Sequence, residues 1–188
     1  NATNIPEERL QPIAKEMGFS ETVFVYPPTD RGQAHVRIRI FMPDSELPFA
    51  GHPVLGTAFV LGVALQAVEV LLETGAGIIP VVLQRDGARP VFGWMKQPLP
   101  RWEPFGEAET RELLAALGVE RSLLPVEIYD NGVRHVLVAL GSEAEVAALA
   151  PDLSRVAALG AIGVNCFAGE AGRWKLRMFA PGKGVAED

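Results

Sequence analysis

Three ionisable side chains stand where a loop meets a helix or a strand, the places from which side chains reach a ligand. Glu21 enters a strand-like segment, His52 precedes a long apolar segment, and Asp188 ends the sequence directly after a second acidic residue. A carboxyl group whose pKa is raised by burial can take up and return a proton. An imidazole can donate or orient a hydrogen bond. The three residue types therefore indicate acid–base chemistry at Glu21, His52 and Asp188.

The segment Ala50-Gly-His-Pro53 also has the features of an anion site. Gly51 allows a ligand to approach the backbone closely, and Pro53 suits the first turn of a helix. Free backbone N–H groups at a helix start bind anions. A small carboxylate substrate would be bound there by Gly51 and His52. The plainer alternative is a tight turn with a solvated histidine.

A repeated motif relates this segment to the end of the sequence. Arg39-Ile-Phe-Met-Pro43 precedes the His52 loop, and Arg177-Met-Phe-Ala-Pro181 precedes Asp188. The repeat predicts a duplicated fold with an active site where the two copies face each other. Without it, Glu21 reads as a surface glutamate and Asp188 as an ordinary carboxylate.

Composition excludes several classes of function. Apolar residues make up 48% of the sequence and charged residues 21%, as in an average globular protein. The net charge of −6 and the lack of a Lys/Arg cluster exclude a nucleic-acid partner. The longest apolar stretch, residues 53–65, is shorter than the ~20 residues of a membrane span. No His, Cys, Asp or Glu cluster has metal-ligand spacing, so we expect no metal.

The location is predicted from the N-terminus and from the single cysteine. Residues 1–20 lack the basic start and apolar core of a signal peptide, and Cys166 cannot form an internal disulfide. We therefore expect a cytoplasmic protein. Cys166 lies in an apolar strand and reads as a buried, inert thiol.

Hydrophobic periodicity predicts two halves, residues 1–98 and 99–188, separated by the proline-rich segment 97–104. In the first half it predicts helices at 6–17 and 54–66 and strands at 22–26, 34–42, 68–73, 78–83 and 91–95. The helix at 54–66 is apolar on all sides, so we expect it to be buried all round. Pro12 should shorten or bend the first helix.

In the second half the same criteria predict helices at 109–117, 143–150 and 153–159 and strands at 126–129, 134–140, 162–168 and 174–179. No apolar helix follows the second Arg-x-Phe-x-Pro motif, and no strand precedes the first helix. We therefore expect the sequence to be a fragment of a longer protein.

Three segments resemble the PhzF family of phenazine-biosynthesis isomerase-like proteins. They are, in the order of the family, Ser20-Glu-Thr22, then Arg39-Ile-Phe-x-Pro with Glu46-Leu-Pro-Phe-Ala-Gly-His-Pro-Val-Leu-Gly-Thr-Ala58, and finally Arg177-Met-Phe-Ala-Pro-Gly-x-Gly-Val-Ala-Glu-Asp188. The middle segment is long and specific, and together the three span most of the sequence.

The resemblance implies an α+β fold of the diaminopimelate epimerase type. In that fold two similar halves each curl a mostly antiparallel sheet around a central helix, with the active site between them. It further implies a homodimer, no cofactor, and isomerisation of a small carboxylate-bearing molecule. By the same resemblance Glu21 is the proton shuttle, His52 and Asp188 orient the substrate and assist proton transfer, and Gly51 helps to hold the substrate carboxylate.

Two alternatives stay open. The first is an amino-acid epimerase or racemase of the same fold. Such enzymes carry a cysteine in each of the two loops, and neither loop has one here, which favours an isomerase that transfers the proton with a carboxylate. A non-catalytic protein that binds a small molecule is the second alternative.

Overall fold

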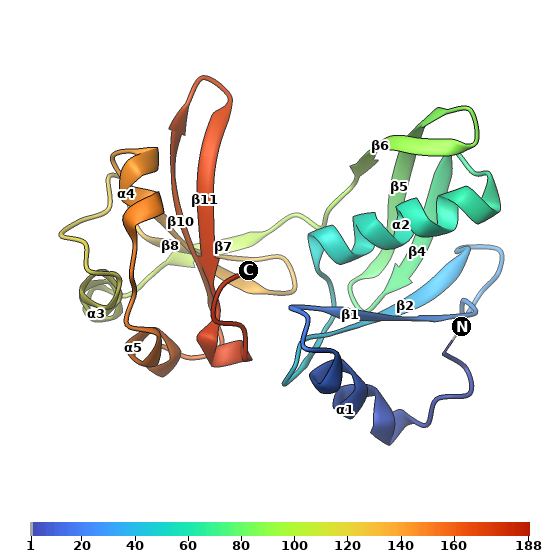
Figure 1. Ribbon diagram of the computed structural model, residues 1–188, viewed down its shortest axis with the longest axis horizontal. Helices are drawn as coiled ribbons and strands as arrows, with labels where there is room; N and C mark the ends of the chain where they lie inside the picture. Colours follow the sequence, from blue (N-terminus) through green and yellow to red (C-terminus); the bar gives the residue numbers. More distant parts are fainter. Residues whose placement is uncertain (1) are drawn as a thin grey trace. The chain divides into compact units, whose positions relative to one another are not determined.

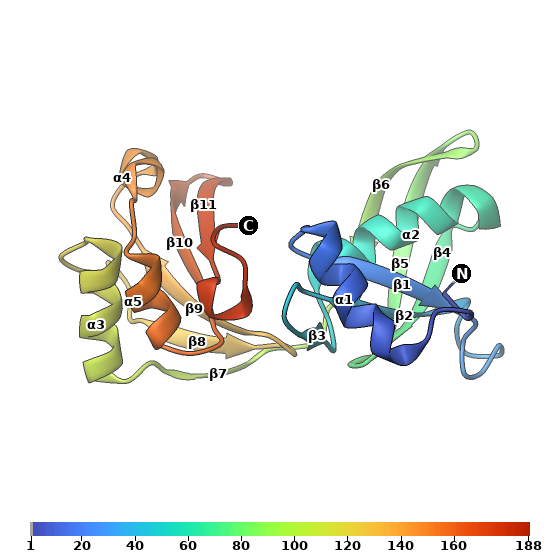
Figure 2. The same ribbon diagram turned by 60° about the horizontal axis from the view of Figure 1, so that its bottom comes forward.

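The structure is a computed structural model in which residues 2–188 are described, and they form two compact units, one that ends at Leu99 and one that comprises Pro100–Asp188. Each unit is a mostly antiparallel sheet with helices packed on it (Figure 1, Figure 2). This confirms the predicted α+β class.

The first unit contains one sheet in the order β1-β2-β4-β5-β6, and β3 pairs with β2. β2 and β4 run parallel, and the other neighbours are antiparallel. The elements are α1 (Glu7–Met17), β1 (Thr22–Tyr26), β2 (Val36–Phe41), β3 (Glu46–Leu47), α2 (Gly51–Leu65), β4 (Glu69–Thr74), β5 (Gly77–Asp86) and β6 (Arg89–Met95).

Helix α2 packs on one face of this sheet and contacts both of its end strands, β1 and β6, so the sheet curls around the helix. Val54 and Ala58 are fully buried on that side, whereas Val60 is 73% exposed and Val63 is exposed as well. The prediction that this helix is buried all round was therefore wrong. The curled sheet does not close, and a strip of apolar helix surface lies open between β1 and β6.

Helix α1 covers the opposite face of the sheet. Its Leu10 and Ala14 pack against Phe24 of β1 and Phe41 of β2, whose rings meet edge to face. The helix continues through Pro12 to Met17, so this proline does not shorten it. The alternative, that Pro12 bends the helix, stays a prediction.

The second unit contains one sheet in the order β11-β10-β9-β8-β7, in which β9 and β10 run parallel and the other neighbours antiparallel. The elements are β7 (Arg101–Pro104), α3 (Glu107–Leu117), β8 (Glu127–Asp130), β9 (Arg134–Ala139), α4 (Glu143–Ala148), α5 (Leu153–Ala158), β10 (Gly163–Glu170), β11 (Arg173–Phe179) and the 3-10 turn η1 (Pro181–Lys183).

Helices α3, α4 and α5 lie on one face of the second sheet (Figure 1) and close a core with Val136, Val138 and Val164. Phe179 of β11 also belongs to this core. Because side chains alternate along a strand, Trp174 and Leu176 of β11 lie on the other face of the sheet, where they are exposed. The second unit therefore has one well-covered face and one apolar face that is open among the described residues.

Most predicted elements appear with bounds shifted by a few residues. The proline-rich segment 97–104, expected to be a boundary, ends in strand β7, which is tolerated because β7 is an edge strand. Gly93 lies inside β6. A Cβ there would come 2.8 Å from Phe59 of α2, so the glycine permits close helix packing.

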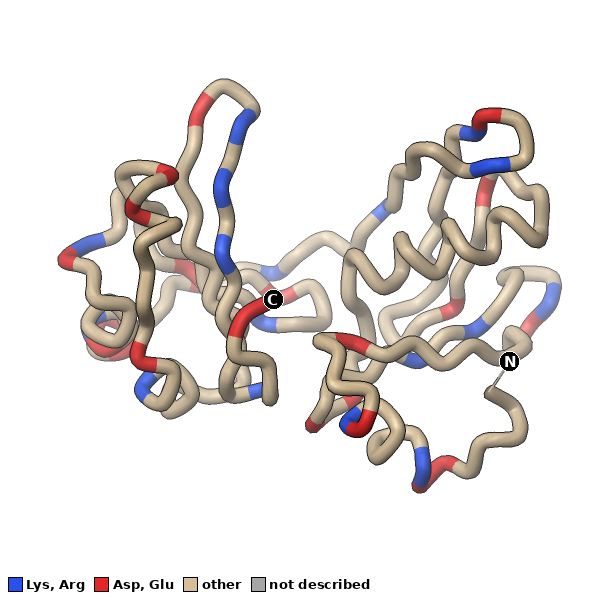
Figure 3. The backbone as a smooth tube through the Cα atoms, viewed as in Figure 1, with Lys and Arg blue, Asp and Glu red and all other residues tan. Residues whose placement is uncertain are grey.

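Acidic and basic residues are interspersed over both units, with a short basic row along β11 (Figure 3). Among the described helices, none has the length and apolar character needed to cross a membrane.

The half-buried His135 of the second unit predicts acid sensitivity. His135 Nδ1 lies 3.1 Å from Asn165 Nδ2. Burial, and then the positive charge of Lys183, lower the pKa of His135, while Asp130 acts in the opposite direction. The stability due to neutral His135 is thus present above its ordinary pKa of 6.5 and is lost as pH falls through the lowered folded-state pKa.

We expect the free energy of unfolding to fall between pH 7.5 and pH 5 and to fall less in His135→Gln. Denaturant unfolding at several pH values measures this. If the free energy of unfolding of the wild type and of His135→Gln fell in parallel with pH, His135 would not be the cause of the acid sensitivity.

Candidate active site

The first unit brings Glu21 and His52 together. Glu21 lies directly before β1, after Gly18 has ended α1 in a left-handed conformation, and His52 is the second residue of α2. Glu21 Oε2 and His52 Nε2 are 2.9 Å apart. The Glu21 side chain is 7% exposed and that of His52 is 65% exposed. A buried carboxylate thus meets an accessible ring, and a proton on either atom is within reach of the other.

A pocket of about 350 Å³ opens beside this pair. Its polar end is formed by Ser20, Glu21 and His52, and its apolar wall by residues of β1 and α2, which are Val23, Val25, Pro53, Val60 and Leu61. A mainly apolar wall with a few convergent polar groups is typical of small-molecule sites. The arrangement suits a small molecule with an apolar ring and a polar edge.

Helix α2 begins earlier than its apolar pattern predicted. It starts at Gly51, so Gly51 and His52 belong to its first turn. The N-terminal cap is Ala50, and among the described residues no side chain caps the helix there and no acidic residue lies in its first turn. The first backbone N–H groups of a helix have no intrahelical partner. Those of Gly51 and His52 are therefore suited to bind an anion.

The chain before α2 is held closely against the turn between β4 and β5. The N–H of Ala76 donates to the carbonyl oxygen of Pro48 at 3.0 Å, and Phe49 is buried. A Cβ on Gly75 would lie 2.8 Å from Pro48 Cα, so only glycine leaves enough room. These contacts fix the position at which α2, and with it His52, begins.

Asp188 belongs to the second unit. It follows the loop after β11, and its backbone N–H donates to the carbonyl oxygen of Met178 at 3.0 Å. Glu187 beside it is bound by Arg177. The participation of Asp188 in the same site as Glu21 and His52 stays a prediction.

Cys166 of β10 is fully buried in the core of the second unit. Burial raises the pKa of its thiol to about 12, against a smaller opposing effect of Arg177. A thiol in that environment is neither a nucleophile nor a proton carrier near neutral pH.

Sequence reasoning missed the residues of the apolar wall. Gly56 and Val60 follow His52 at intervals of four and therefore lie on the same helix face. Val23 and Val25 alternate along β1 on the side of the pocket. The helical spacing from His52 was the available signal for this wall.

Comparison with known proteins identifies the family. The family model PhzC-PhzF, described as phenazine biosynthesis-like protein, matches residues 1–188. The chain belongs to this family. The predicted resemblance to PhzF proteins is thereby confirmed.

Individual relatives agree with this assignment. The chain is 48% identical over 181 residues to the trans-2,3-dihydro-3-hydroxyanthranilate isomerase of Pseudomonas aeruginosa, a match that covers 96% of this chain and 64% of the relative. A PhzF-family phenazine biosynthesis protein of Bacillus anthracis is 25% identical, with a TM-score of 0.79 over 100% of this chain and 67% of that structure. The chain spans 64% to 66% of the length of its Pseudomonas relatives.

The fold extends beyond the PhzC-PhzF family. A hydroxyproline epimerase from Agrobacterium vitis is 15% identical, with a TM-score of 0.59 over 89% of this chain and 55% of that structure. At this identity the likeness concerns the fold alone, and it confirms the predicted epimerase-type fold.

Gly56 provides a test of the pocket. A Cβ at Gly56 would have no protein atom within 4 Å and would project beside the pocket. Gly56→Ala should stabilise the helix by about 0.5–1 kcal/mol. We expect it also to raise KM about tenfold, which corresponds to about 1.4 kcal/mol of lost binding. Thermal unfolding and steady-state kinetics measure the two effects.

Gly62 of the same helix is the matched control, because a Cβ there would overlap Leu83. Gly62→Ala should destabilise the protein by about 1–3 kcal/mol without raising KM. Unchanged KM in Gly56→Ala would show that the substrate does not use this pocket.

Proposed function

We propose that this chain is part of a cofactor-independent isomerase that moves a proton on a small carboxylate-bearing substrate, with Glu21 as the proton shuttle. The observation that carries the proposal is the buried Glu21 carboxylate, 2.9 Å from His52 at the polar end of an apolar-walled pocket. The isomerase names of the relatives at 45% to 48% identity support it.

In this reaction the Glu21 carboxylate removes a proton from one carbon of the substrate, and the electron pair of the broken C–H bond moves into the conjugated system. The protonated Glu21 then returns the proton to a second carbon. The substrate is isomerised, and no proton is gained or lost overall. A single carboxyl group can serve both steps because it is base in the first and acid in the second.

The other candidate residues orient the substrate. The N–H groups of Gly51 and His52 at the start of α2 bind the substrate carboxylate, and the His52 ring lies close enough to exchange a proton with Glu21. Asp188 contributes from the second unit, as the family resemblance implies. Each of these roles belongs to the proposal.

The substrate class follows from the pocket and from the names of the relatives. The Pseudomonas relatives are named for trans-2,3-dihydro-3-hydroxyanthranilate, a ring that carries a carboxylate. The apolar wall formed by Val23, Val25 and Val60 suits one face of such a ring. We propose that the natural substrate is this compound or a closely related cyclic carboxylate. We also propose that the protein is a cytoplasmic homodimer. Each subunit would have two similar halves, with the boundary between them near residue 98.

The amino-acid epimerase of the same fold is the weaker candidate. It would need a reactive thiol in the site, whereas Cys166 is buried in the helix-covered core and its pKa is raised.

The proton shuttle is tested by turnover in deuterated water. The full-length protein is incubated with trans-2,3-dihydro-3-hydroxyanthranilate, and the product is analysed by NMR. Because the exposed His52 ring lies 2.9 Å from Glu21, the proton on Glu21 can exchange with solvent before its return, and we expect deuterium at one carbon of the product. Because a general acid–base group contributes about 10²–10⁴-fold, Glu21→Gln should lower kcat by that factor with an unchanged fold.

Glu16→Gln, an exposed glutamate of α1, is the matched control and should turn over like the wild type. Full activity in Glu21→Gln would rule out the shuttle. Binding without turnover, with an affinity that Glu21→Gln does not change, would favour a binding protein.

The thiol of Cys166 gives an independent test of the epimerase alternative. We expect a thiol-reactive probe such as dithionitrobenzoate to modify Cys166 only when the protein unfolds, because burial raises its pKa to about 12. Absorbance at increasing urea concentration follows the reaction. Rapid modification of the native protein with parallel loss of activity would instead support thiol chemistry.

A further inference from the structure

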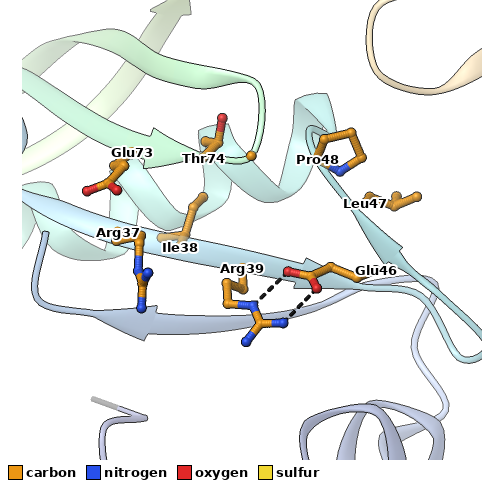
Figure 4. Close-up of a pocket in the computed structure, with 9 residues that line it drawn as sticks. Arg37, Ile38, Arg39, Glu46, Leu47, Pro48, Glu73 and Thr74 are labelled. Atoms are coloured by element: carbon orange, nitrogen blue, oxygen red, sulfur yellow. Dashed lines mark hydrogen bonds and ion pairs between the residues drawn. The ribbon is translucent and has the colours of Figure 1, made fainter. Parts of the chain in front are cut away.

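The arginine of each Arg-x-Phe-x-Pro motif binds a glutamate through two parallel hydrogen bonds. Arg39 Nε and Nη2 donate to the two carboxylate oxygens of Glu46 at 2.7 and 2.6 Å (Figure 4). Arg177 Nε and Nη2 donate to those of Glu187 at 2.6 and 2.8 Å. The two copies of the motif therefore share a specific interaction, although the glutamates follow at different distances in the sequence.

The remaining surroundings of the two guanidinium groups also correspond. Arg39 lies over the ring of Phe41 at 5.1 Å, and Arg177 lies over the ring of Phe179 at 4.9 Å. Each ring belongs to the phenylalanine of the same motif. The Arg-x-Phe spacing places the two side chains on the same strand face, where stacking limits the rotation of the guanidinium plane.

The third nitrogen of each guanidinium reaches a neighbouring helix. Arg39 Nη1 donates to Glu7 at the start of α1 at 2.5 Å. Arg177 Nη1 donates to the carbonyl oxygen of Leu149, directly after α4, at 2.6 Å. Each arginine thus joins a strand, a following loop and a helix in one set of hydrogen bonds.

These connections lead to the candidate catalytic side chains. Glu46 opens β3, from which the chain continues through Pro48 to the first turn of α2 and His52. Glu7 opens α1, which leads to Glu21. Arg39 therefore joins the two segments that place the Glu21–His52 pair.

In the second unit the connection is shorter, because Glu187 is the residue before Asp188. The backbone of the loop returns onto the end of β11 through the N–H of Asp188, which donates to Met178. Arg177 fixes the side chain of Glu187 at the same place. The loop backbone that carries Asp188 is thereby held at the end of β11.

The two pairs differ from ordinary surface ion pairs. The side chains of Arg39 and Arg177 are each only 22% exposed. The guanidinium of Arg177 lowers the pKa of Glu187. Single exposed ion pairs contribute little, whereas two-bond arginine–carboxylate pairs are geometrically specific.

We propose that Arg39 and Arg177 are positioning residues for the reaction, each holding through its glutamate the loop that carries a candidate catalytic side chain. This inference rests on the proposed function. The two-bond geometry is essential to it, because the ammonium group of lysine keeps the charge but cannot form the planar fork.

The test is steady-state kinetics of Arg39→Lys and Arg177→Lys in the full-length protein with trans-2,3-dihydro-3-hydroxyanthranilate. The control is Arg155→Lys, since Arg155 contacts Glu112 at 3.1 Å through a single nitrogen on the exposed surface of the second unit. Because a displacement of about 1 Å at a catalytic group can cost 10²-fold, we expect kcat to fall about 10- to 100-fold in the two variants. The control should keep its kcat.

Structural and positioning roles are separated by assaying well below the melting temperature. A purely structural role would lower the melting temperature and leave kcat unchanged, and that result in both variants would overturn the inference. A wild-type protein that folds but has no turnover would instead contradict the proposed function.

A double-mutant cycle keeps the test decisive if a lysine variant is unstable. The cycle consists of Arg177→Met, Glu187→Gln and the double variant that carries both substitutions. If the pair acts as one unit, the double variant should lose no more kcat than Arg177→Met or Glu187→Gln alone. Additive losses in kcat would overturn the inference, because they would show that the two residues act separately.

Discussion

The packing of α2 into the curled sheet of the first unit is the constraint on which the candidate site depends. Val54 and Ala58 are fully buried against the strands, and a fully buried valine contributes about 1.5–3 kcal/mol. A rotation of the helix would expose this face, so its register on the sheet is fixed. With it the first turn of the helix is fixed beside the start of β1, where His52 meets Glu21. The contact between Glu21 and His52 is therefore a consequence of apolar packing.

The sequence predicted the helices and strands better than their long-range contacts and their burial. The apolar run 54–66 indicated a helix, and alternation indicated most strands, because both signals are local. The Glu21–His52 contact joins residues far apart in sequence, and only the family resemblance indicated it. The exposed side of α2 was not predictable, because apolar residues on all sides do not reveal how far a sheet closes. The role of Asp188 stays a prediction.

The repeated motif predicted a duplication but not the function of its arginines. Arg39 and Arg177 read as polar positions on half-buried strands, and nothing in the local pattern identifies their partners. Glu46 and Glu187 follow them by seven and ten residues, so a search for one fixed spacing would miss the pair. Guanidinium geometry explains why both copies use arginine, since a carboxylate needs two parallel donors to be held in one orientation.

The junction between β2 and β4 has a consequence for the motions of the first unit. These strands pair through Val36 with Leu72 and Arg37 with Glu73, and the N–H of His35 just before β2 donates to the carbonyl oxygen of Leu71, whereas β4 pairs with β5 along its whole length. Cooperative units that open below the global unfolding energy often coincide with supersecondary motifs. The sheet would divide into β1-β2-β3 and β4-β5-β6, and α2 contacts strands of both parts. A transient opening at this boundary would move β1 relative to α2 and so separate Glu21 from His52.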